Sequence, residues 1–335
     1  MEKKVYVFDP TVTDKQSRVR GIGRYLEIMK ENLSNDFIFT SQKNIPYDAV
    51  LVNPFFNLLQ LPFSFKKIAH KQITIIHDLI PQKYPQHFPI GIRGKINYFL
   101  NRLNLSNYDL IITQSEAGKK DIINLLNVPG KKIQLINPTL PQIFWNNQSP
   151  ITNHQSPVTN YCLYVGDATW NKNLVNLARA IKLADVKCIF AGKVFENKNN
   201  LDHSWQQELK DFYAEIKDDP HFILKGYVND QELIKLYQNA VCNILISHDE
   251  GFGFSYVEAL SQNCPSLLAD TDISHEIALD TAVYVDQNQP QLIAKKIQQF
   301  FQNKNLRTQV LRNKKRVLDK YNQQQFKQQW LKSIK

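Results

Sequence analysis

The 335-residue chain has only four cysteines and no long apolar run, and each scarcity excludes a class of protein. The cysteines are scattered and form no Cys-x-x-Cys pair, so the sequence indicates neither a disulfide framework nor a zinc site. No segment approaches the roughly 18 consecutive apolar residues of a membrane-spanning helix. The N-terminal sequence MEKKVYVFDP predicts a strand and not a signal peptide. We therefore expect a cytoplasmic protein, with the inner face of the plasma membrane as a further site.

The composition is that of a soluble globular protein, with 43% hydrophobic residues, 21% charged residues and a net charge of +10. The bases gather in the first half: residues 1–160 hold 19 Lys and Arg against 11 Asp and Glu, and residues 161–335 hold 22 against 20. Segment 61–105 interleaves bases with Phe, Leu, Ile and Tyr, which suits a peripheral contact with an anionic membrane. A solvated basic face with no partner is the alternative. No nucleic-acid-binding module accompanies the charge, so we expect no nucleic-acid partner.

Short apolar strands alternate with helices through both halves of the chain, and this alternation is typical of parallel sheets covered on both faces. The first half predicts strands at 5–9, 37–40, 49–52, 73–78, 110–115 and 133–137 and helices at 21–33, 91–104 and 116–126. Residues 141–160 are polar, contain three prolines and predict a linker. The second half predicts strands at 162–167, 186–193, 222–226, 242–247, 265–269 and 282–286, helices at 173–184, 205–217, 230–239 and 255–262, and a helical tail from Gln291. The fold class is therefore α/β, with two doubly wound domains.

The segment from Ile244 to Asp270 reads as a strand, a loop with two glycines, a helix and a second strand. Glycines let a backbone approach a ligand closely, and a helix N-terminus offers N–H groups with a partial positive charge. Glu250 and Glu258 bracket this loop, where carboxylates accept hydrogen bonds from sugar hydroxyls. The pattern suits a phosphorylated ligand. A surface loop with two ordinary acids is the alternative.

Two further loops in the first half follow predicted strands, where ligands of parallel sheets usually lie. Gly21, Gly23 and Arg24 open a helix and offer a place for a phosphate. They are not a dinucleotide fingerprint, because the third glycine is absent and Leu26 stands in its place. His77 ends a strand, and it either donates to a substrate oxygen or is a core histidine satisfied by Asp78.

In the second half, Lys172 and Lys193 each follow a strand, a position from which a flexible cation can reach a diphosphate; a solvated lysine is the alternative. Asp270 and Asp272 form an Asp-x-Asp pair of the kind that binds a metal-diphosphate complex in some sugar transferases. A polar turn is expected at that place, and the histidines show no ligand spacing. We therefore expect no metal site.

Several of these loops together resemble one family, in the expected order along nearly the whole chain. The matching segments are GIGRY (21–25), IIHDLIP (75–81), VGDATWNKNL (165–174), KGYVNDQEL (225–233), EGFGFSYVEALSQNCPSLLAD (250–270) and HEI (275–277). They resemble glycosyltransferase family 4, retaining sugar-nucleotide-dependent transferases with the two-domain GT-B fold. The resemblance implies an acceptor-binding domain at 1–155 plus about 318–335 and a donor-binding domain at 156–317. The domains would face each other across a cleft, with the last helix crossing back to the first domain.

The resemblance also implies roles for individual residues. Glu250 would contact the donor sugar near the reacting centre, Glu258 would bind the ribose, and Lys172 would neutralise the leaving diphosphate. His77 would assist at the sugar or at the acceptor hydroxyl. The other implied donor-binding residues are Gly21, Gly23, Gly251, Phe252, Gly253 and Phe254. No enzymic nucleophile, metal or cofactor is implied.

One position departs from the pattern of many family members, which carry an arginine just before the lysine. Here that position is Asn171. The substitution lowers the positive charge available to the diphosphate, and it leaves room for Lys193 or Arg24 to supply a cation or for weaker activity.

The resemblance predicts a hexosyltransferase that uses GDP-mannose or a UDP-sugar as donor. The acceptor would be a glycan, lipid-linked, in the synthesis of a bacterial surface polysaccharide such as lipopolysaccharide O-antigen or capsule. Two alternatives stay open: a catalytically weak sugar-nucleotide-binding partner of another transferase, suggested by Asn171, and a GT-B-like epimerase of nucleotide sugars.

Overall fold

The structure is a computed structural model that describes residues 3–12, 21–147, 160–196 and 201–335. The chain divides into two compact units: unit 1 is Met1–Pro141 with Tyr321–Lys335, and unit 2 is Gln142–Lys320. The domain boundary predicted near residue 155 lies outside the described residues. Within the described ranges, no helix combines the length and the apolar character needed to cross a membrane.

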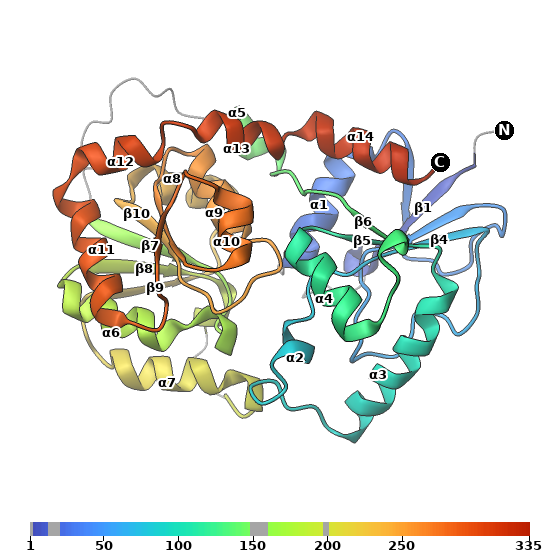
Figure 1. Cartoon of the computed structure of the whole chain (residues 1–335), viewed down its shortest axis with the longest axis horizontal. Helices are drawn as coiled ribbons and strands as arrows, with labels where there is room; N and C mark the ends of the chain where they lie inside the picture. Colours follow the sequence, from blue (N-terminus) through green and yellow to red (C-terminus); the bar gives the residue numbers. More distant parts are fainter. Residues whose placement is uncertain (1–2, 13–20, 148–159, 197–200) are drawn as a thin grey trace. The chain divides into compact units, whose positions relative to one another are not determined.

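Unit 1 contains a six-stranded parallel sheet with the strand order β2-β1-β3-β4-β5-β6 (Figure 1). Its strands are β1 (Val5–Phe8), β2 (Phe37–Thr40), β3 (Val50–Asn53), β4 (Lys71–Ile75), β5 (Leu110–Thr113) and β6 (Ile133–Leu135), and its helices are α1 (Gly21–Leu33), α2 (Ile80–Lys83), α3 (Ile92–Asn104), α4 (Glu116–Leu126) and α14 (Gln323–Ser333). The central strands are rich in Val, Ile and Leu and are buried on both faces, as parallel strands must be.

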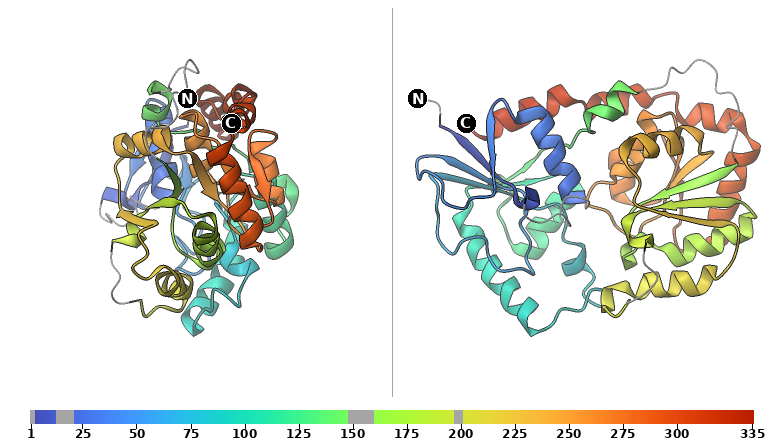
Figure 2. Two further views of the ribbon diagram at one scale, coloured as in Figure 1. Left: turned by 90° about the vertical axis from the view of Figure 1, so that its left-hand side faces the viewer. Right: turned by 180° about the vertical axis from the view of Figure 1, so that it is seen from behind.

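The last helix of the chain is part of unit 1, where α14 packs against α1. The ring of Tyr25 in α1 meets the ring of Phe326 edge-on at 5.9 Å, and Phe37 in β2 meets Trp330 at 6.2 Å. Trp330 is fully buried, so burial of this large ring holds the C-terminal helix on the unit. Figure 2 shows α1 and α14 on one face of the sheet.

Unit 2 contains a second six-stranded parallel sheet with the order β12-β11-β10-β7-β8-β9. Its strands are β7 (Tyr161–Val165), β8 (Lys187–Ala191), β9 (Phe222–Gly226), β10 (Cys242–Leu245), β11 (Ser266–Ala269) and β12 (Val283–Val285). Its helices are α5 (Gln142–Asn146), α6 (Leu174–Ala184), α7 (Gln207–Ile216), α8 (Asp230–Asn239), α9 (Phe254–Ser261), α10 (Asp272–Ala278), α11 (Pro290–Gln302), α12 (Lys304–Val310) and α13 (Lys314–Lys320). Helices α6, α7 and α11 pack together, as do α5, α8 and α9.

The predicted α/β class and the two doubly wound sheets are confirmed, and helix α1 has the predicted bounds. Several predicted strands end too late, because the polar residues after each apolar run belong to the following loop. The linker predicted at 141–160 is wrong at its start: Gln142–Asn146 is helix α5 of unit 2. Phe144 of that helix is buried, and its carbonyl accepts a hydrogen bond from Gln262 Nε2 at 3.1 Å.

The strand order reverses once in each sheet, and the reversal locates the ligand sites that each fold offers. In unit 1 the chain passes from β1 to β2 on one side and then to β3 on the other; in unit 2 the same reversal separates β7 from β10. At such a point the connections leave in opposite directions, and the carboxyl ends of the two strands border an open crevice. The loops after β1 and β3 in unit 1 and those after β7 and β10 in unit 2 are therefore the candidate ligand sites.

The loops after β7 and β8 approach each other so closely that a side chain is excluded. A Cβ atom added to Gly192 would lie 2.1 Å from the carbonyl oxygen of Gly166, which is backbone and cannot turn away. Glycine at position 192 is thus required by close approach of two loops, and its φ of 166° is ordinary extended backbone.

We predict that Gly192→Ala lowers the free energy of unfolding by about 1–3 kcal/mol, because the new methyl group forces the two loops apart. Urea unfolding measures the change. The matched control is Gly91→Ala, where an added Cβ meets nothing within 4 Å and φ is −72°; its effect should stay within about 0.5 kcal/mol. Equal effects of the two substitutions would contradict the prediction.

Candidate active site

Lys172 and Glu250 lie at the point in unit 2 where the strand order reverses. Lys172 ends the short 3-10 helix Trp170–Lys172 in the loop after β7, and Glu250 lies in the loop after β10. Since β7 and β10 are parallel neighbours, their carboxyl ends meet at one edge of the sheet. Two residues that are 78 positions apart in sequence are thereby brought into contact.

The two side chains form a bidentate ion pair. Lys172 Nζ lies 2.7 Å from Glu250 Oε1 and 2.8 Å from Oε2, and the Ser247 hydroxyl donates to Oε1 at 2.6 Å. The side chains are 18% and 13% exposed, so the pair is shielded from water yet reachable. The hydroxyl group of Tyr164 is buried, which raises its pKa well above the ordinary value. The negative charge of Glu250 raises the pKa of Tyr164 further.

Asn171 connects the loop after β7 to the loop after β10. Its Nδ2 donates to the Asp249 carbonyl at 3.0 Å, and its Oδ1 accepts from the Thr169 hydroxyl at 2.8 Å. The backbone N–H of His248 donates to the Asn171 carbonyl at 2.7 Å. Because the side chain is buried and uses both ends of its amide, it fixes the positions of Lys172 and Glu250 on either side.

Asn173 makes a second connection between the same parts of the unit. It adopts a left-handed conformation, with φ of 57°, between the 3-10 helix and α6. Its Nδ2 donates to the carbonyls of Ile246 at 3.1 Å and Gln287 at 2.7 Å. Asparagine tolerates this backbone region better than most residues do. Asn173 can therefore form the turn and also donate the hydrogen bonds that connect the loops.

The glycine loop Gly251–Phe254 leads directly from Glu250 into helix α9. Gly253 has φ of 91°, and an added Cβ would lie 3.0 Å from Ile277 Cδ1 and 3.3 Å from Leu245 Cδ2. Phe252 is buried, and its ring meets Phe254 at 5.1 Å. No side chain caps the N-terminus of α9. The start of this helix is therefore a place where backbone N–H groups favour an anion.

The neighbouring helix α6 differs, because a carboxylate already serves its N-terminus. Glu208 Oε1 accepts from the N–H of Val175 at 3.0 Å, and burial raises the pKa of this carboxyl group. A phosphate in unit 2 would thus meet positive charge at Lys172 and at the start of α9.

Other predicted residues of unit 2 have contacts or positions of their own. Glu258 is 3% exposed, and its Oε2 accepts from the Tyr237 hydroxyl at 3.0 Å inside the unit. Lys193 is exposed at the start of a 3-10 helix after β8. Asp270 lies 2.6 Å from His275 Nε2, and Asp272 opens helix α10. The roles predicted for Glu258 and Lys193 stay predictions.

The predicted residues of unit 1 gather around the start of α1. Gly21 and Gly23 lie in its first turn, and Arg24 Nη1 is 3.8 Å from Glu27 Oε2. The ring of Tyr25, the next residue, meets His77 edge-on at 5.2 Å.

His77 is held as a neutral ring with a fixed tautomer. The Gln114 amide donates to Nδ1 at 2.5 Å, so Nε2 carries the proton and donates to the Pro54 carbonyl at 3.0 Å. Asp78, which the sequence offered as its partner, instead accepts from the N–H of Ile80 at 3.2 Å. Burial lowers the pKa of His77 to about 4.

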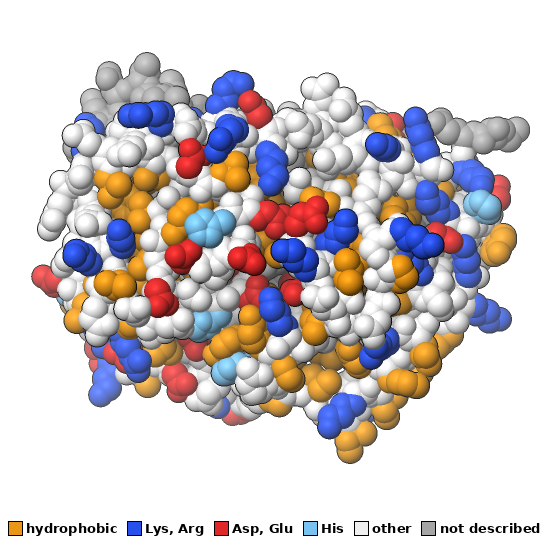
Figure 3. All heavy atoms as spheres, viewed as in Figure 1, with side chains coloured by type: hydrophobic (Ala, Val, Ile, Leu, Met, Phe, Trp, Pro, Cys, Tyr) orange, Lys and Arg blue, Asp and Glu red, His pale blue; other side chains and the backbone are white. Residues whose placement is uncertain are grey.

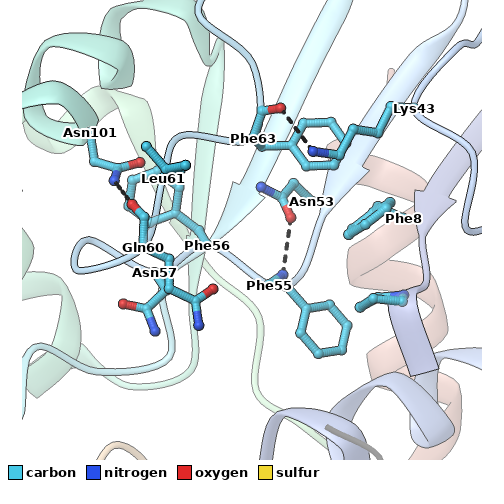
Figure 4. Close-up of a pocket in the computed structure, with 11 residues that line it drawn as sticks. Phe8, Lys43, Asn53, Phe55, Phe56, Asn57, Gln60, Leu61, Phe63 and Asn101 are labelled. Carbon is cyan, nitrogen blue, oxygen red and sulfur yellow. Dashed lines mark hydrogen bonds between the residues drawn. The ribbon is translucent and has the colours of Figure 1, made fainter. Parts of the chain in front are cut away.

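Unit 1 has a pocket of about 230 Å³ at its own reversal of strand order (Figure 4). Phe8 ends β1, Asn53 ends β3 and Lys43 follows β2. The Lys43 ammonium lies 4.7 Å from the centre of the Phe63 ring. The full lining is Phe8, Pro10, Lys43, Asn53, Phe55, Phe56, Asn57, Gln60, Leu61, Phe63 and Asn101. Aromatic faces beside amide groups suit an uncharged ligand that carries both C–H and hydroxyl groups.

Sequence reasoning missed this pocket and the tethers of the ion pair. Ser247 lies outside the motif segments, and no role was predicted for Asn173 within VGDATWNKNL, because both roles depend on which strand lies beside β7. The pocket residues come from the ends and following loops of β1, β2 and β3 and from Asn101 of helix α3, so the tertiary structure is needed to bring them together. A polar residue at the end of a predicted strand, such as Asn53, was the one available signal.

Residues 152–317 match the model of a protein family described as glycosyl transferases group 1. The Lys172–Glu250 pair and the glycine loop both lie within this segment. Unit 2 therefore carries a glycosyl transferases group 1 domain, and the two six-stranded parallel sheets have the GT-B fold of glycosyltransferases.

The chain resembles two curated bacterial proteins. It is 28% identical to the O-antigen chain mannosyltransferase RfbU of Salmonella typhimurium over 220 residues, which cover 65% of this chain and 58% of that protein. It is 24% identical to O-antigen chain mannosyltransferase B of Escherichia coli over 241 residues, which cover 70% of this chain and 62% of that protein. The match thus spans about six tenths of each relative.

Two solved structures share the fold along nearly the whole chain. Anabaena HepE in complex with UDP-glucose gives a TM-score of 0.68 at 13% identity and covers 99% of both chains. A glycosyltransferase from Rickettsia africae gives a TM-score of 0.64 at 15% identity and covers 100% of this chain and 98% of its own. At these identities the likeness establishes the fold alone.

We predict that His77 makes unit 1 less stable as the pH falls from about 6.5 towards 4. Between these pH values His77 is protonated in the unfolded chain but neutral in the folded protein. The pKa change from 6.5 to about 4 corresponds to about 3 kcal/mol of unfolding free energy. In His77→Gln this contribution is lost, so the stability difference between wild type and variant should shrink by about that amount between pH 7 and pH 4. Urea unfolding at both pH values measures it; a constant difference would show that His77 is not held neutral.

Proposed function

We propose that the protein is a retaining hexosyltransferase that moves a hexose from a nucleotide diphosphate sugar to a glycan acceptor. The observation that carries the proposal is the bidentate Lys172–Glu250 ion pair, at the point where the strand order of the group 1 domain reverses. A mobile cation and a carboxylate at one position suit the two halves of such a donor, because the diphosphate is anionic and the sugar carries hydroxyl groups.

In the proposed reaction the bond between the anomeric carbon and the diphosphate oxygen breaks while the acceptor hydroxyl oxygen bonds to that carbon on the same face. The hydroxyl proton passes to the departing phosphate oxygen, so no enzymic nucleophile is needed. Lys172 leaves the Glu250 carboxylate for the diphosphate and stabilises the negative charge that develops there. Glu250 then accepts hydrogen bonds from the donor sugar. The proposal requires no metal and no cofactor.

The comparisons support two donors. The names of the Salmonella and Escherichia relatives favour GDP-mannose, and the UDP-glucose bound to HepE supports a UDP-sugar. The names of these relatives also support an O-antigen chain as the acceptor, and we propose that this glycan is lipid-linked. We assign the sugar end of this acceptor to the unit 1 pocket, whose 230 Å³ is below the range of about 300–1,000 Å³ that drug-sized ligands occupy and suits one sugar ring.

We predict that Lys172→Met and Glu250→Gln each reduce turnover by about 100- to 1,000-fold, the usual effect of removing one group that stabilises transition-state charge. Release of GDP or UDP from GDP-mannose, UDP-glucose and UDP-galactose, with and without a glycan acceptor, measures turnover. The same release should persist in EDTA.

Lys187→Met is the matched control for these variants, because Lys187 is exposed at the start of β8, the opposite end of the strands. Its turnover should equal that of wild type. Unchanged turnover in both Lys172→Met and Glu250→Gln would contradict the site. A wild type that binds a donor in calorimetry but turns over none of them would favour a binding partner of another transferase.

We predict that Asn57→Ala and Gln60→Ala weaken sugar binding to the unit 1 pocket by about fivefold each, since one hydrogen bond is worth about 1 kcal/mol. Both amides are exposed on the pocket wall. Titration of methyl α-mannoside and methyl α-glucoside by saturation-transfer NMR measures the affinity, and Gln86→Ala, an exposed amide outside the pocket, is the control. Equal binding by all three variants and wild type would remove the acceptor from this pocket.

A further inference from the structure

Helix α3 buries polar side chains and exposes apolar ones, the reverse of an ordinary surface helix. Its buried residues are Asn97, Asn101 and Asn104. Its exposed large apolar residues are Ile92, Ile96, Phe99 and Leu103, which are 80%, 54%, 61% and 60% exposed. The apolar side of this 13-residue helix therefore faces outward from unit 1.

The buried asparagines explain how the helix is held in this orientation. Asn97 Nδ2 donates to the Leu59 carbonyl at 3.0 Å, and Asn101 Nδ2 donates to the Gln60 carbonyl at 2.6 Å. These carbonyl groups belong to the loop between β3 and β4 and therefore have no hydrogen bond within a sheet. The two asparagines supply their donors. Hydrogen bonds from the polar side of α3 therefore help to fix its orientation, together with half-buried Tyr98, which packs against the apolar core of unit 1.

The four exposed residues form one continuous stripe. Their spacing, i, i+4, i+7 and i+11, places them on a single side of the helix over about 17 Å of its length. The loop between β3 and β4 has exposed apolar residues of its own, Leu61 and Phe65, which are 72% and 66% exposed, and Leu61 lines the pocket of unit 1. Exposed apolar residues are ordinary when single, but a contiguous group marks a surface that another body covers.

The charged residues of the helix that carries the stripe all have one sign. Helix α3 itself carries Arg93, Lys95 and Arg102 and no acidic residue. Between residues 49 and 108 the only acid is Asp78, whose carboxylate accepts from a backbone N–H. Figure 3 shows hydrophobic side chains together with Lys and Arg along the edge of the molecule where α3 lies in Figure 1.

We propose that α3 docks unit 1 on an anionic lipid bilayer, with Ile92, Ile96, Phe99 and Leu103 entering the interface between headgroups and acyl chains. Two interactions favour such a surface. The apolar stripe is buried against the acyl chains, and the basic side chains are attracted to the phosphate groups. An acidic protein would match the bases alone, and a second copy of this chain would bring like charge against like charge. The inference concerns binding to lipid and does not depend on the proposed transferase activity.

The test is flotation of the whole protein with vesicles of phosphatidylcholine alone and with 30% phosphatidylglycerol. Wild type should bind the anionic vesicles and release them as salt is raised. Ile96→Gln with Phe99→Gln should weaken binding about tenfold or more, because two apolar groups no longer enter the interface. Leu183→Gln with Leu292→Gln removes two exposed leucines of unit 2 and should bind as wild type does.

A charge variant separates the two contributions. Arg93→Gln, Lys95→Gln and Arg102→Gln together should cost roughly 100-fold on anionic vesicles, at about 1 kcal/mol for each base, and should abolish the preference for phosphatidylglycerol. Phe99→Trp should show greater quenching by brominated lipid than wild type does, because the stripe itself enters the bilayer.

Two outcomes would overturn the proposal: no binding of wild type to anionic vesicles, or equal binding by the stripe variant. If sedimentation showed a wild-type dimer that the stripe variant lacks, the stripe would belong to a second copy. Ile92→Gln with Leu103→Gln is a second stripe variant, should the first fail to fold by circular dichroism. Nucleotide release without vesicles should be the same in wild type and stripe variant, which separates failure of docking from failure of the transferase proposal.

Discussion

The candidate site in unit 2 is built around the ion pair between Lys172 and Glu250. Each charge satisfies the other, with Nζ 2.7 Å and 2.8 Å from the two carboxylate oxygens. The contact exists because β10 lies beside β7, and the parallel strands deliver both loops to one edge. An anionic ligand that draws the ammonium away also releases the carboxylate for hydroxyl groups. Under the proposed function, this one ion pair would therefore serve both the diphosphate and the sugar of the donor.

Asn171 stands where many members of the resembled family carry an arginine, and its hydrogen bonds hold the two loops that carry the ion pair. An amide both donates and accepts, so this side chain bonds to the Asp249 carbonyl and the Thr169 hydroxyl at once. An arginine has five donors and no acceptor, and it could not make the second bond. The sequence suggested that asparagine only subtracts charge from the site. In the structure Asn171 joins the two loops that carry Lys172 and Glu250. The position therefore contributes hydrogen bonds between the loops in place of a positive charge.

The parts of the structure that sequence reasoning captured are those that depend on local pattern. Apolar runs predicted the strands, and the glycines at 251 and 253 predicted the loop that leads into α9. Strand order is not local, so neither the contact of Lys172 with Glu250 nor the pocket at Asn53 followed from the pattern. Helix α5 escaped because its five residues are too few to show a period. Helix α3 was predicted, but periodicity alone does not say which side of a helix faces the protein.

Helix α3 also connects the two proposals made for unit 1. Asn101 lines the pocket with one side of the helix, while Phe99 and Leu103 belong to the exposed stripe on the other. A helix is about 10–12 Å across with its side chains, so the pocket and the docking surface are separated by one helix diameter. A lipid-linked glycan needs such a separation, because its sugar must lie in a polar pocket while its hydrocarbon stays in the bilayer. Under these two proposals the reversed polarity of α3 would meet both needs with one element: Asn101 lines the wall of the pocket, and the apolar stripe would hold that wall at the membrane surface.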